Sequence, residues 1–146
     1  MENLVNDLNL FLSNLNVFYR KLQNYHWNII GKDFFVIHSK LEEYYDKVNK
    51  QIDEIAEHIL VINGQPLGRM KDYLENAQIQ EADTVKIKDN EVFTAVIKDY
   101  ELLLQEVTKI KEEADEQNDY LTSSLMDNYI LDYAKILWML KQMMQS

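Results

Sequence analysis

Residues 37–62 read IHSKLEEYYDKVNKQIDEIAEHILVI, and this stretch decides the fold. Its apolar residues recur at steps of three and four, which is the period of an amphipathic helix. They are Ile37, Leu41, Tyr44, Val48, Ile52 (or Gln51), Ile55, Ile59 and Ile62. Asp33 is a candidate N-cap, Asn63-Gly64 closes the stretch, and Pro66 prevents its immediate resumption. The sequence therefore predicts one helix of about thirty residues.

The same helix carries two pairs of candidate metal ligands, His38 with Glu42 and Asp53 with Glu57. The members of each pair are four residues apart and share a helix face. The fifteen residues from His38 to Asp53 place the pairs ~22 Å apart along the axis. They also lie roughly 60° apart around it. One chain therefore offers two half-sites, and two antiparallel copies related by a two-fold axis would complete two identical sites.

His26 is a third candidate ligand, because it lies near the end of the preceding predicted helix and can face the same region as His38. Two imidazoles with up to three carboxylates suit Fe, Mn or Zn, and do not suit Cu(I) or an iron–sulfur cluster. Each residue also has an ordinary interpretation. A histidine beside an apolar stripe is usually a core or boundary residue, and acids four apart are usually a solvated helix face.

Two further observations limit the kind of site. No Glu-x-x-His motif occurs in the chain, which argues against an ordinary di-iron site inside one helical bundle. His58 follows Glu57 but points about 100° away from it, so we interpret it as a surface residue.

Three other periodic stretches predict helices over residues 3–30, 90–116 and 121–143, with Gly31 as the stop of the first. Residues 64–90 form a long connection in which 70–77 can make a short helix, and no strand is expected. This pattern predicts an all-α, ferritin-like four-helix bundle, with a short extra helix in the crossover between the second and third long helices. Residues 1–146 are expected to form a single domain.

Composition narrows the class of protein. Hydrophobic residues make up 47% and charged residues 27% of the 146, which is typical of a folded globular chain. No apolar run approaches the ~20 residues that span a membrane. The absence of Cys and of a basic N-terminal region favours a cytoplasmic location. The net charge of −10 opposes binding to DNA phosphates; it can concentrate cations or serve solubility alone.

Several runs resemble the Dps family of ferritin-like miniferritins. The shared order is His26, a second His twelve residues on, a carboxylate four further, Asp eleven beyond and Glu four beyond that. The resemblance covers about residues 24–66, and the helix lengths agree over nearly the whole chain. The runs are NYHWN at 24–28, FFVIH at 34–38, LEEYYD at 41–46, IDEIAE at 52–57 and GQP at 64–66.

This resemblance implies a hollow dodecamer with ferroxidase sites at two-fold interfaces. His26, His38 and Glu42 would come from one subunit, and Asp53 and Glu57 from its neighbour. The implied reaction is oxidation of Fe(II), with hydrogen peroxide favoured over dioxygen. Fe(III) mineral would be stored in the cavity, which protects against oxidative stress. The family often has Asp where Glu42 stands, so the spacing of two irons could differ.

The resemblance also implies roles for three residues outside the ligand set. Trp27 matches a family tryptophan beside the site, either an electron donor to stray one-electron oxidants or a buried aromatic anchor. Asp119 and Asp127 lie on either side of Thr122 at the start of the last helix, where the family lines an iron-uptake pore. Ser124 stands where an acid is common, and helix-end solvation is the alternative for both Asp residues.

DNA binding is in doubt, because the chain lacks the basic terminal tails through which many members bind DNA. An alternative function is a nucleoid-associated protein that shields DNA with little catalytic role. A further alternative is a helical bundle or metal buffer without redox turnover. If the protein is a ferroxidase, Fe(II) and hydrogen peroxide are its expected small-molecule partners.

Overall fold

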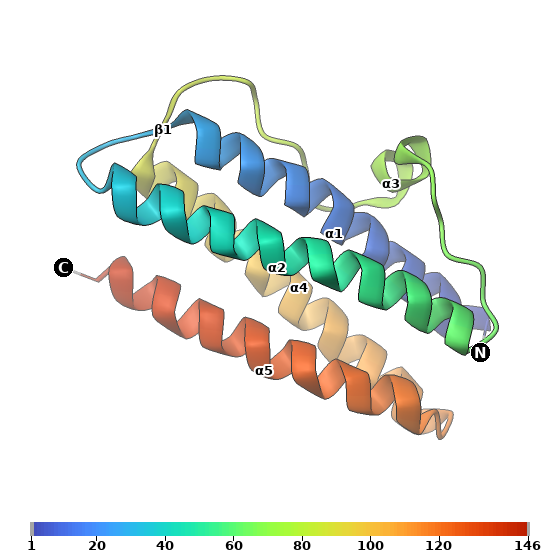
Figure 1. The fold of residues 1–146 in the computed structure, drawn as a ribbon. Coiled ribbons are helices and arrows are strands. Elements are labelled where there is room, and N and C mark those ends of the chain that lie inside the picture. The colour runs from blue at the N-terminus through green and yellow to red at the C-terminus, as the bar shows by residue number, and fades with distance from the viewer. Residues whose placement is uncertain (1, 146) are drawn as a thin grey trace.

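The computed structural model describes residues 2–145 and is built from two pairs of long helices (Figure 1). Helix α1 (Glu2–Asn28) packs along α2 (Phe34–Val61), and α4 (Asp89–Glu116) packs along α5 (Tyr120–Met143). The crossover from α2 to α4 carries a short helix, α3 (Met70–Asn76), which lies beside α1. The predicted four-helix bundle with an extra crossover helix is therefore confirmed. None of the helices among the described residues has the length and apolarity needed to cross a membrane.

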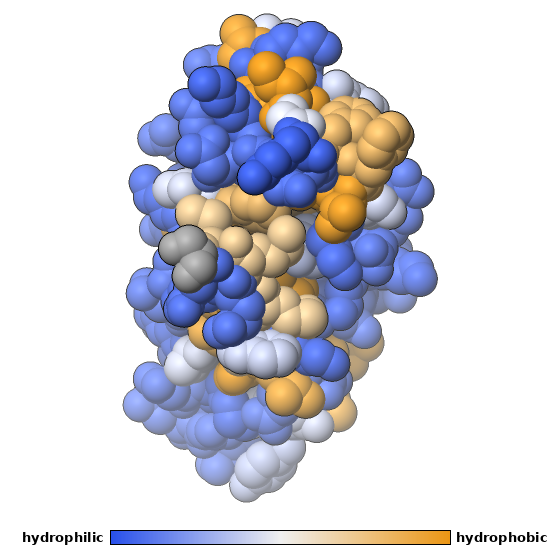
Figure 2. Space-filling model, turned by 90° about the vertical axis from the view of Figure 1, so that its left-hand side faces the viewer, coloured by the Kyte–Doolittle hydropathy of each residue, from blue (hydrophilic) through white to orange (hydrophobic). Residues whose placement is uncertain are grey.

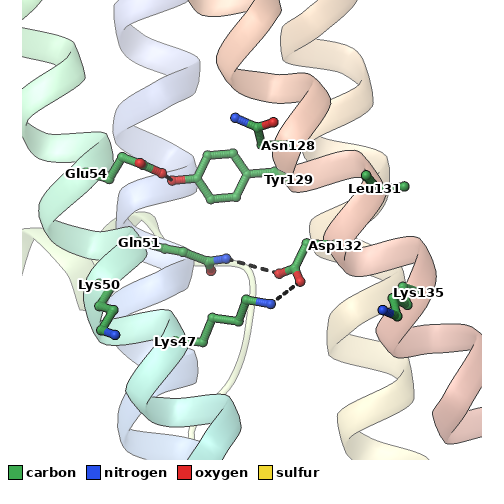
Figure 3. A pocket seen from close by; sticks show the side chains of 9 residues that line it. All are labelled: Lys47, Lys50, Gln51, Glu54, Asn128, Tyr129, Leu131, Asp132 and Lys135. Atoms are coloured by element: carbon green, nitrogen blue, oxygen red, sulfur yellow. Dashed lines mark hydrogen bonds and ion pairs between the residues drawn. The ribbon is translucent and has the colours of Figure 1, made fainter.

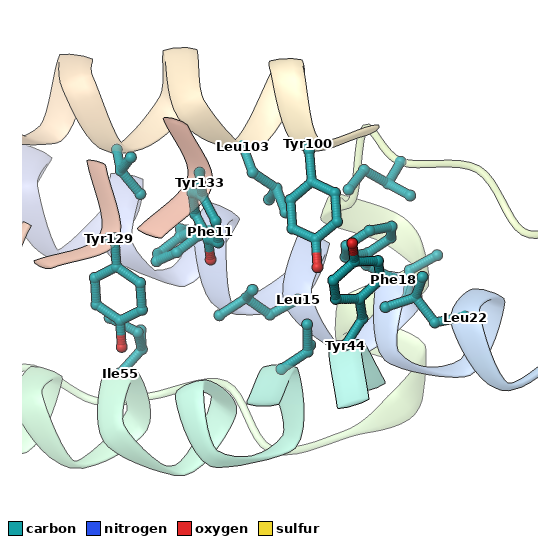
Figure 4. Packing of buried hydrophobic residues seen from close by; sticks show 14 of the residues in the cluster. Phe11, Leu15, Phe18, Leu22, Tyr44, Ile55, Tyr100, Leu103, Tyr129 and Tyr133 are labelled. Atoms are coloured by element: carbon teal, nitrogen blue, oxygen red, sulfur yellow. The ribbon is translucent and has the colours of Figure 1, made fainter. Parts of the chain in front are cut away.

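The core is aromatic at its centre (Figure 4). Phe18 meets Tyr100 edge-on with ring centroids 4.9 Å apart, and Phe11 meets Tyr129 in the same way at 5.5 Å. These contacts join α1 to α4 and to α5, so the two helix pairs share one apolar interior. The fully buried Tyr133 hydroxyl donates to Gln51 Oε1 at 2.9 Å, which satisfies both polar groups.

Two very short strands correct the expectation of a strand-free chain. Strand β1 (Ile29–Ile30) pairs in parallel with β2 (Ile87–Lys88), with Ile29 opposite Ile87 and Ile30 opposite Lys88. Because Ile29 and Ile30 join this ladder, α1 ends at Asn28 and not at residue 30. The partners lie far apart in sequence, so hydrophobic periodicity carried no sign of the pairing. The ladder ties the end of the crossover to the α1–α2 turn.

The turns at the two ends of α2 depend on backbone geometry. Gly31 has φ +141°, and a Cβ added there would come within 2.5 Å of Asp89 Oδ2. Asp33 occupies the N-cap position as predicted, but its side chain makes no capping hydrogen bond. At the other end, Asn63 adopts φ +67° and the Gly64 N–H donates to Ile59 O at 2.8 Å. The apolar stripe of α2 left open whether residue 51 or 52 faces the core, and the structure buries Gln51 and leaves Ile52 half-buried.

Candidate metal centre

His26 and His38 are brought together at the α1–α2 turn. Their imidazole rings stack with centroids 3.7 Å apart and planes 9° from parallel. His26 Nδ1 lies 2.6 Å from the backbone oxygen of His38, and His38 Nδ1 lies 2.7 Å from the backbone oxygen of His26. This reciprocal pair of hydrogen bonds fixes both rings relative to the turn. His26 is buried and His38 is half-buried.

The hydrogen bonds also fix the tautomer of each histidine. A backbone oxygen can only accept, so each Nδ1 carries the hydrogen and donates. In the neutral ring, Nε2 is then left with a free lone pair. A metal-ligating histidine commonly donates its other N–H to a backbone oxygen, which orients the ring and raises its basicity. Each imidazole therefore presents an oriented nitrogen lone pair of the kind that can bind a metal.

Glu42 adds a carboxylate to the same place. Its Oε1 lies 3.8 Å from His26 Nε2, and its side chain is 56% exposed. Glu42 lies four residues after His38 on α2, so it projects from the same side of that helix. The structure thus brings together the three residues predicted for one half-site.

Asp53 and Glu57 lie further along α2 and are both exposed. Neither forms an ion pair among residues 2–145. Within those residues of one chain, no group of three or more His, Asp or Glu side chains is arranged to hold a metal ion. The chain by itself therefore presents two oriented imidazoles with one nearby carboxylate, and a separate pair of free carboxylates.

Exposed apolar side chains lie close in sequence to both groups of predicted ligands on α2. Phe35 is 84% exposed and Val36 is 62% exposed, immediately before His38 in the chain. Figure 2 looks at this end of the bundle and shows apolar atoms gathered among hydrophilic ones. Leu60 and Val61 are exposed in the same way just after Glu57. Clustered exposed apolar residues typically mark a surface that another protein covers.

Trp27 follows His26 and is 55% exposed, so in the single chain it is not the buried anchor that one interpretation expected. Together with Arg20, Asn24 and Thr84 it lines a hollow of about 240 Å³ beside the end of the crossover. Exposure leaves its indole accessible to a solute.

At the opposite end of α2, His58 is half-buried, which corrects its interpretation as a surface residue. Its Nε2 lies 2.7 Å from Thr122 Oγ1, and that hydroxyl donates to Asp119 Oδ2 at 2.6 Å. Burial lowers the pKa of His58, because the charged imidazolium is disfavoured away from water. The α5 residue that His58 contacts is 64 positions away, so no local pattern indicated it.

The two acids near Thr122 have partners in the chain. Asp119 is the N-cap of α5, and its Oδ1 accepts from the Thr122 backbone N–H at 3.1 Å. Asp127 is exposed and lies 2.7 Å from Lys111 Nζ. Asp119 therefore has a structural role as a cap, Asp127 has an exposed ion-pair partner, and a pore role for either remains a prediction.

A second hollow, of about 480 Å³, lies between α2 and α5 (Figure 3). Asp132 accepts from Lys47 and, at 3.3 Å, from Gln51 Nε2, while the Tyr129 hydroxyl donates to the Glu54 carboxylate. These polar groups satisfy one another, and none of the predicted ligands lines the hollow. The histidine half-site is therefore the better candidate for chemistry.

Comparison with known proteins identifies the family. The ferritin-like domain family matches residues 5–146. "DNA protection during starvation protein 2" of Bacillus anthracis is 41% identical over 134 residues, covering 92% of this chain and 91% of the relative. The crystal structure of a Dps protein from Vibrio cholerae O1 has a TM-score of 0.94 at 39% identity, covering 99% of this chain and 90% of that one. That protein is described as a member of a broad superfamily of ferritin-like diiron-carboxylate proteins. This chain belongs to the Dps family of ferritin-like proteins.

Proposed function

We propose that the protein oxidises Fe(II), with hydrogen peroxide preferred over dioxygen, and stores the Fe(III) product as mineral inside a hollow dodecamer. The observation that carries this proposal is the stacked, hydrogen-bonded pair His26 and His38 with Glu42 beside it. Membership in the Dps family supports it. The proposed role is protection against oxidative stress.

The proposed site is shared between two chains. His26, His38 and Glu42 of one subunit would meet Asp53 and Glu57 of its neighbour across a two-fold axis. The exposed apolar residues support this register. An antiparallel pairing of two α2 helices that sets His38 opposite Glu57 also sets Phe35 opposite Leu60, and both of these are exposed in one chain. The same contact would then cover both apolar groups and complete the ligand set.

The residues supply ligation, orientation and charge balance. The Nδ1–H bonds hold both rings, leaving each Nε2 lone pair for an iron substrate. The carboxylates offset the positive charge that grows as Fe(II) becomes Fe(III). Two Fe(II) ions at one site deliver two electrons, which reduce one hydrogen peroxide to two waters with uptake of two protons. Delivering both electrons together avoids release of a hydroxyl radical.

The test compares Fe(II) oxidation by peroxide in the wild type and in a His38→Ala, Asp53→Ala double variant. Loss of a group that only orients a ligand costs about 10–100-fold in metal affinity or activity, so loss of two ligands should cost at least about 100-fold. Glu43→Gln is the matched control, because Glu43 is an exposed α2 carboxylate whose ion-pair partner is Lys40. Equal rates in the double variant and the wild type would overturn the proposal. Metal binding without peroxide-dependent turnover would favour a metal buffer instead.

Two companion measurements address assembly and DNA. Light scattering should give the mass of twelve 17.4 kDa chains. A gel-shift at low salt should show no retardation of DNA without added metal, because a net charge of −10 repels phosphates. Metal-independent retardation would favour a nucleoid-shielding role, and a monomeric mass would contradict the shared site.

A further inference from the structure

Asn14 joins three parts of the fold through one buried amide. The residue is fully buried on α1, and its Nδ2 donates to both carboxylate oxygens of Glu106 on α4, at 3.0 and 3.1 Å. Its Oδ1 accepts from the backbone N–H groups of Gln78 and Ile79 in the crossover, at 2.7 and 3.0 Å. Both ends of the amide are therefore fully used. Asn14 holds the crossover at residues 78–79 and also contacts Glu106, so a change at Glu106 affects this attachment of the crossover.

Glu106 belongs to a series of polar contacts along the α1–α4 seam. Lys21 Nζ lies 2.7 Å from Asp99 Oδ2, and the side chains of Lys21 and Asp99 are both buried. This pair lies seven residues along each helix from the Asn14–Glu106 contact. On the other side, Glu113 lies close enough to Asp7 for the two carboxyl groups to interact. The α1 members are seven residues apart and the α4 members are seven apart in the reverse order. The seam is thus an antiparallel ladder with a heptad repeat.

Glu106 and Glu113 hold protons more tightly than ordinary carboxyls. Burial raises the pKa of Glu106 to about 7, and Asp7 adds to the rise while Asn14 and Lys109 oppose it. The interaction with Asp7, then burial, raises the pKa of Glu113 as well. On α5, burial raises the pKa of Tyr133 well above its usual value, and the charge of Glu106 adds to that rise. A hollow of about 210 Å³ lined by Asp7, Glu106 and Lys109 gives water a route to the seam.

We propose that the α1–α4 seam is a proton-sensitive clamp on the crossover, closed when Glu106 and Glu113 are protonated and loosened when they ionise. A buried carboxyl is favoured in its neutral form, whereas a carboxylate gains free energy from hydration. Asn14 donates more strongly to a carboxylate than to a neutral carboxyl, but the effect of burial on Glu106 is the larger one. Ionised Glu106 therefore draws water through the hollow, and this hydration loosens the junction at Asn14. Ionised Glu113 places two like charges together at the neighbouring contact with Asp7.

The direction of the pH effect follows from proton linkage. A carboxyl whose pKa is raised by folding stabilises the folded chain below its ordinary value of 4.5, and that stabilisation is lost as the pH rises through about 7. An opening that fully hydrates Glu106 thus becomes about tenfold more favourable between pH 6 and pH 8. The loosening should be strongest at Gln78 and Ile79, whose N–H groups Asn14 holds.

Hydrogen–deuterium exchange of the assembled protein at pH 6, 7 and 8 tests the clamp. After correction for the intrinsic pH dependence of exchange, protection of residues 78–79 should fall about tenfold over this range. Glu106→Gln keeps the size and an acceptor oxygen but cannot ionise, so its protection should stay nearly constant. Glu112→Gln makes the same change at an exposed position of α4 and should behave as the wild type.

Two outcomes would overturn the proposal. One is flat protection of residues 78–79 in the wild type between pH 6 and pH 8, a measurement that requires no variant. The other is a Glu106→Gln protein that keeps the tenfold slope. Circular dichroism and light scattering of the variant establish that it is folded and assembled before the comparison is made.

Discussion

Mixing two inactive variants should restore iron oxidation if each site is shared between chains. His38→Ala removes an imidazole from one half-site, and Asp53→Ala removes a carboxylate from the other. On α2 these positions are fifteen residues apart, or ~22 Å along the axis, so one metal cannot bind both within one chain. In a mixed pair, the unaltered His38 of one chain therefore faces the unaltered Asp53 of the other.

The size of the recovery follows from the pairing statistics. Equal amounts of two variants that assemble at random give mixed pairs in about half of all two-fold contacts, and one of the two sites in each mixed pair is intact. About one quarter of wild-type sites should therefore return. Mixing His38→Ala with Glu42→Ala is the matched control. Both changes fall in the same half-site, so every site in every pair lacks a ligand.

The assay requires the chains to exchange, so the two variants are unfolded together and refolded at equal concentration. Initial rates of peroxide-dependent Fe(II) oxidation are then compared with those of wild type treated in the same way. Absence of recovery in the His38→Ala and Asp53→Ala mixture, with dodecamers formed, would refute the two-chain geometry. Recovery in the control mixture would refute it equally, because it would mean that His38 and Glu42 of one site come from different chains.

Three smaller predictions concern stability and the pore. Gly64→Ala places a Cβ 2.8 Å from both Val5 methyl carbons and should cost ~1–3 kcal/mol in denaturant unfolding, whereas Gly68→Ala meets nothing within 4 Å and should be neutral. Tyr133→Phe removes the hydroxyl that donates to Gln51, so the buried Gln51 Oε1 loses its partner, and the change should cost roughly 1–2 kcal/mol in the same measurement. Asp119→Ala should cost ~1 kcal/mol by removing the α5 cap. Asp119→Asn should keep the cap, so a slower iron uptake in that variant would reveal a pore role and an unchanged uptake would exclude it.

The helices could be predicted from sequence because each buries one continuous apolar stripe, and a stripe is a local signal. The distance between the two ligand pairs was predictable for a related reason, since the rise of a helix is constant. The β1–β2 ladder could not be predicted in this way. It depends on Ile29 meeting Ile87. Residues 84–88 alternate in hydrophobicity over one short run, but Ile29-Ile30 does not alternate, so the sequence shows no matching partner for that run.

The α1–α4 polar ladder was also missed, although the sequence contains a faint sign of it. Asp7, Asn14 and Lys21 are seven residues apart and lie close to the apolar stripe of α1. Polar residues at a heptad repeat on an apolar helix indicate buried partners on a neighbouring helix. The identity of that neighbour depends on which helices pack together, and periodicity alone does not determine it.

The proposed meeting of the half-sites would couple assembly to cation binding. One chain already holds His26 and His38 by hydrogen bonds to the turn, so the imidazoles lose little freedom when a metal binds. The proposed contact would, however, bring the exposed acids Asp53 and Glu57 toward Glu42, and like charges repel. A cation bound at the shared site offsets that repulsion, and a ligand that binds only the paired state stabilises pairing by mass action. Divalent cations should therefore strengthen the two-fold contact of the wild type, and should have less effect when Glu42 is replaced by Gln.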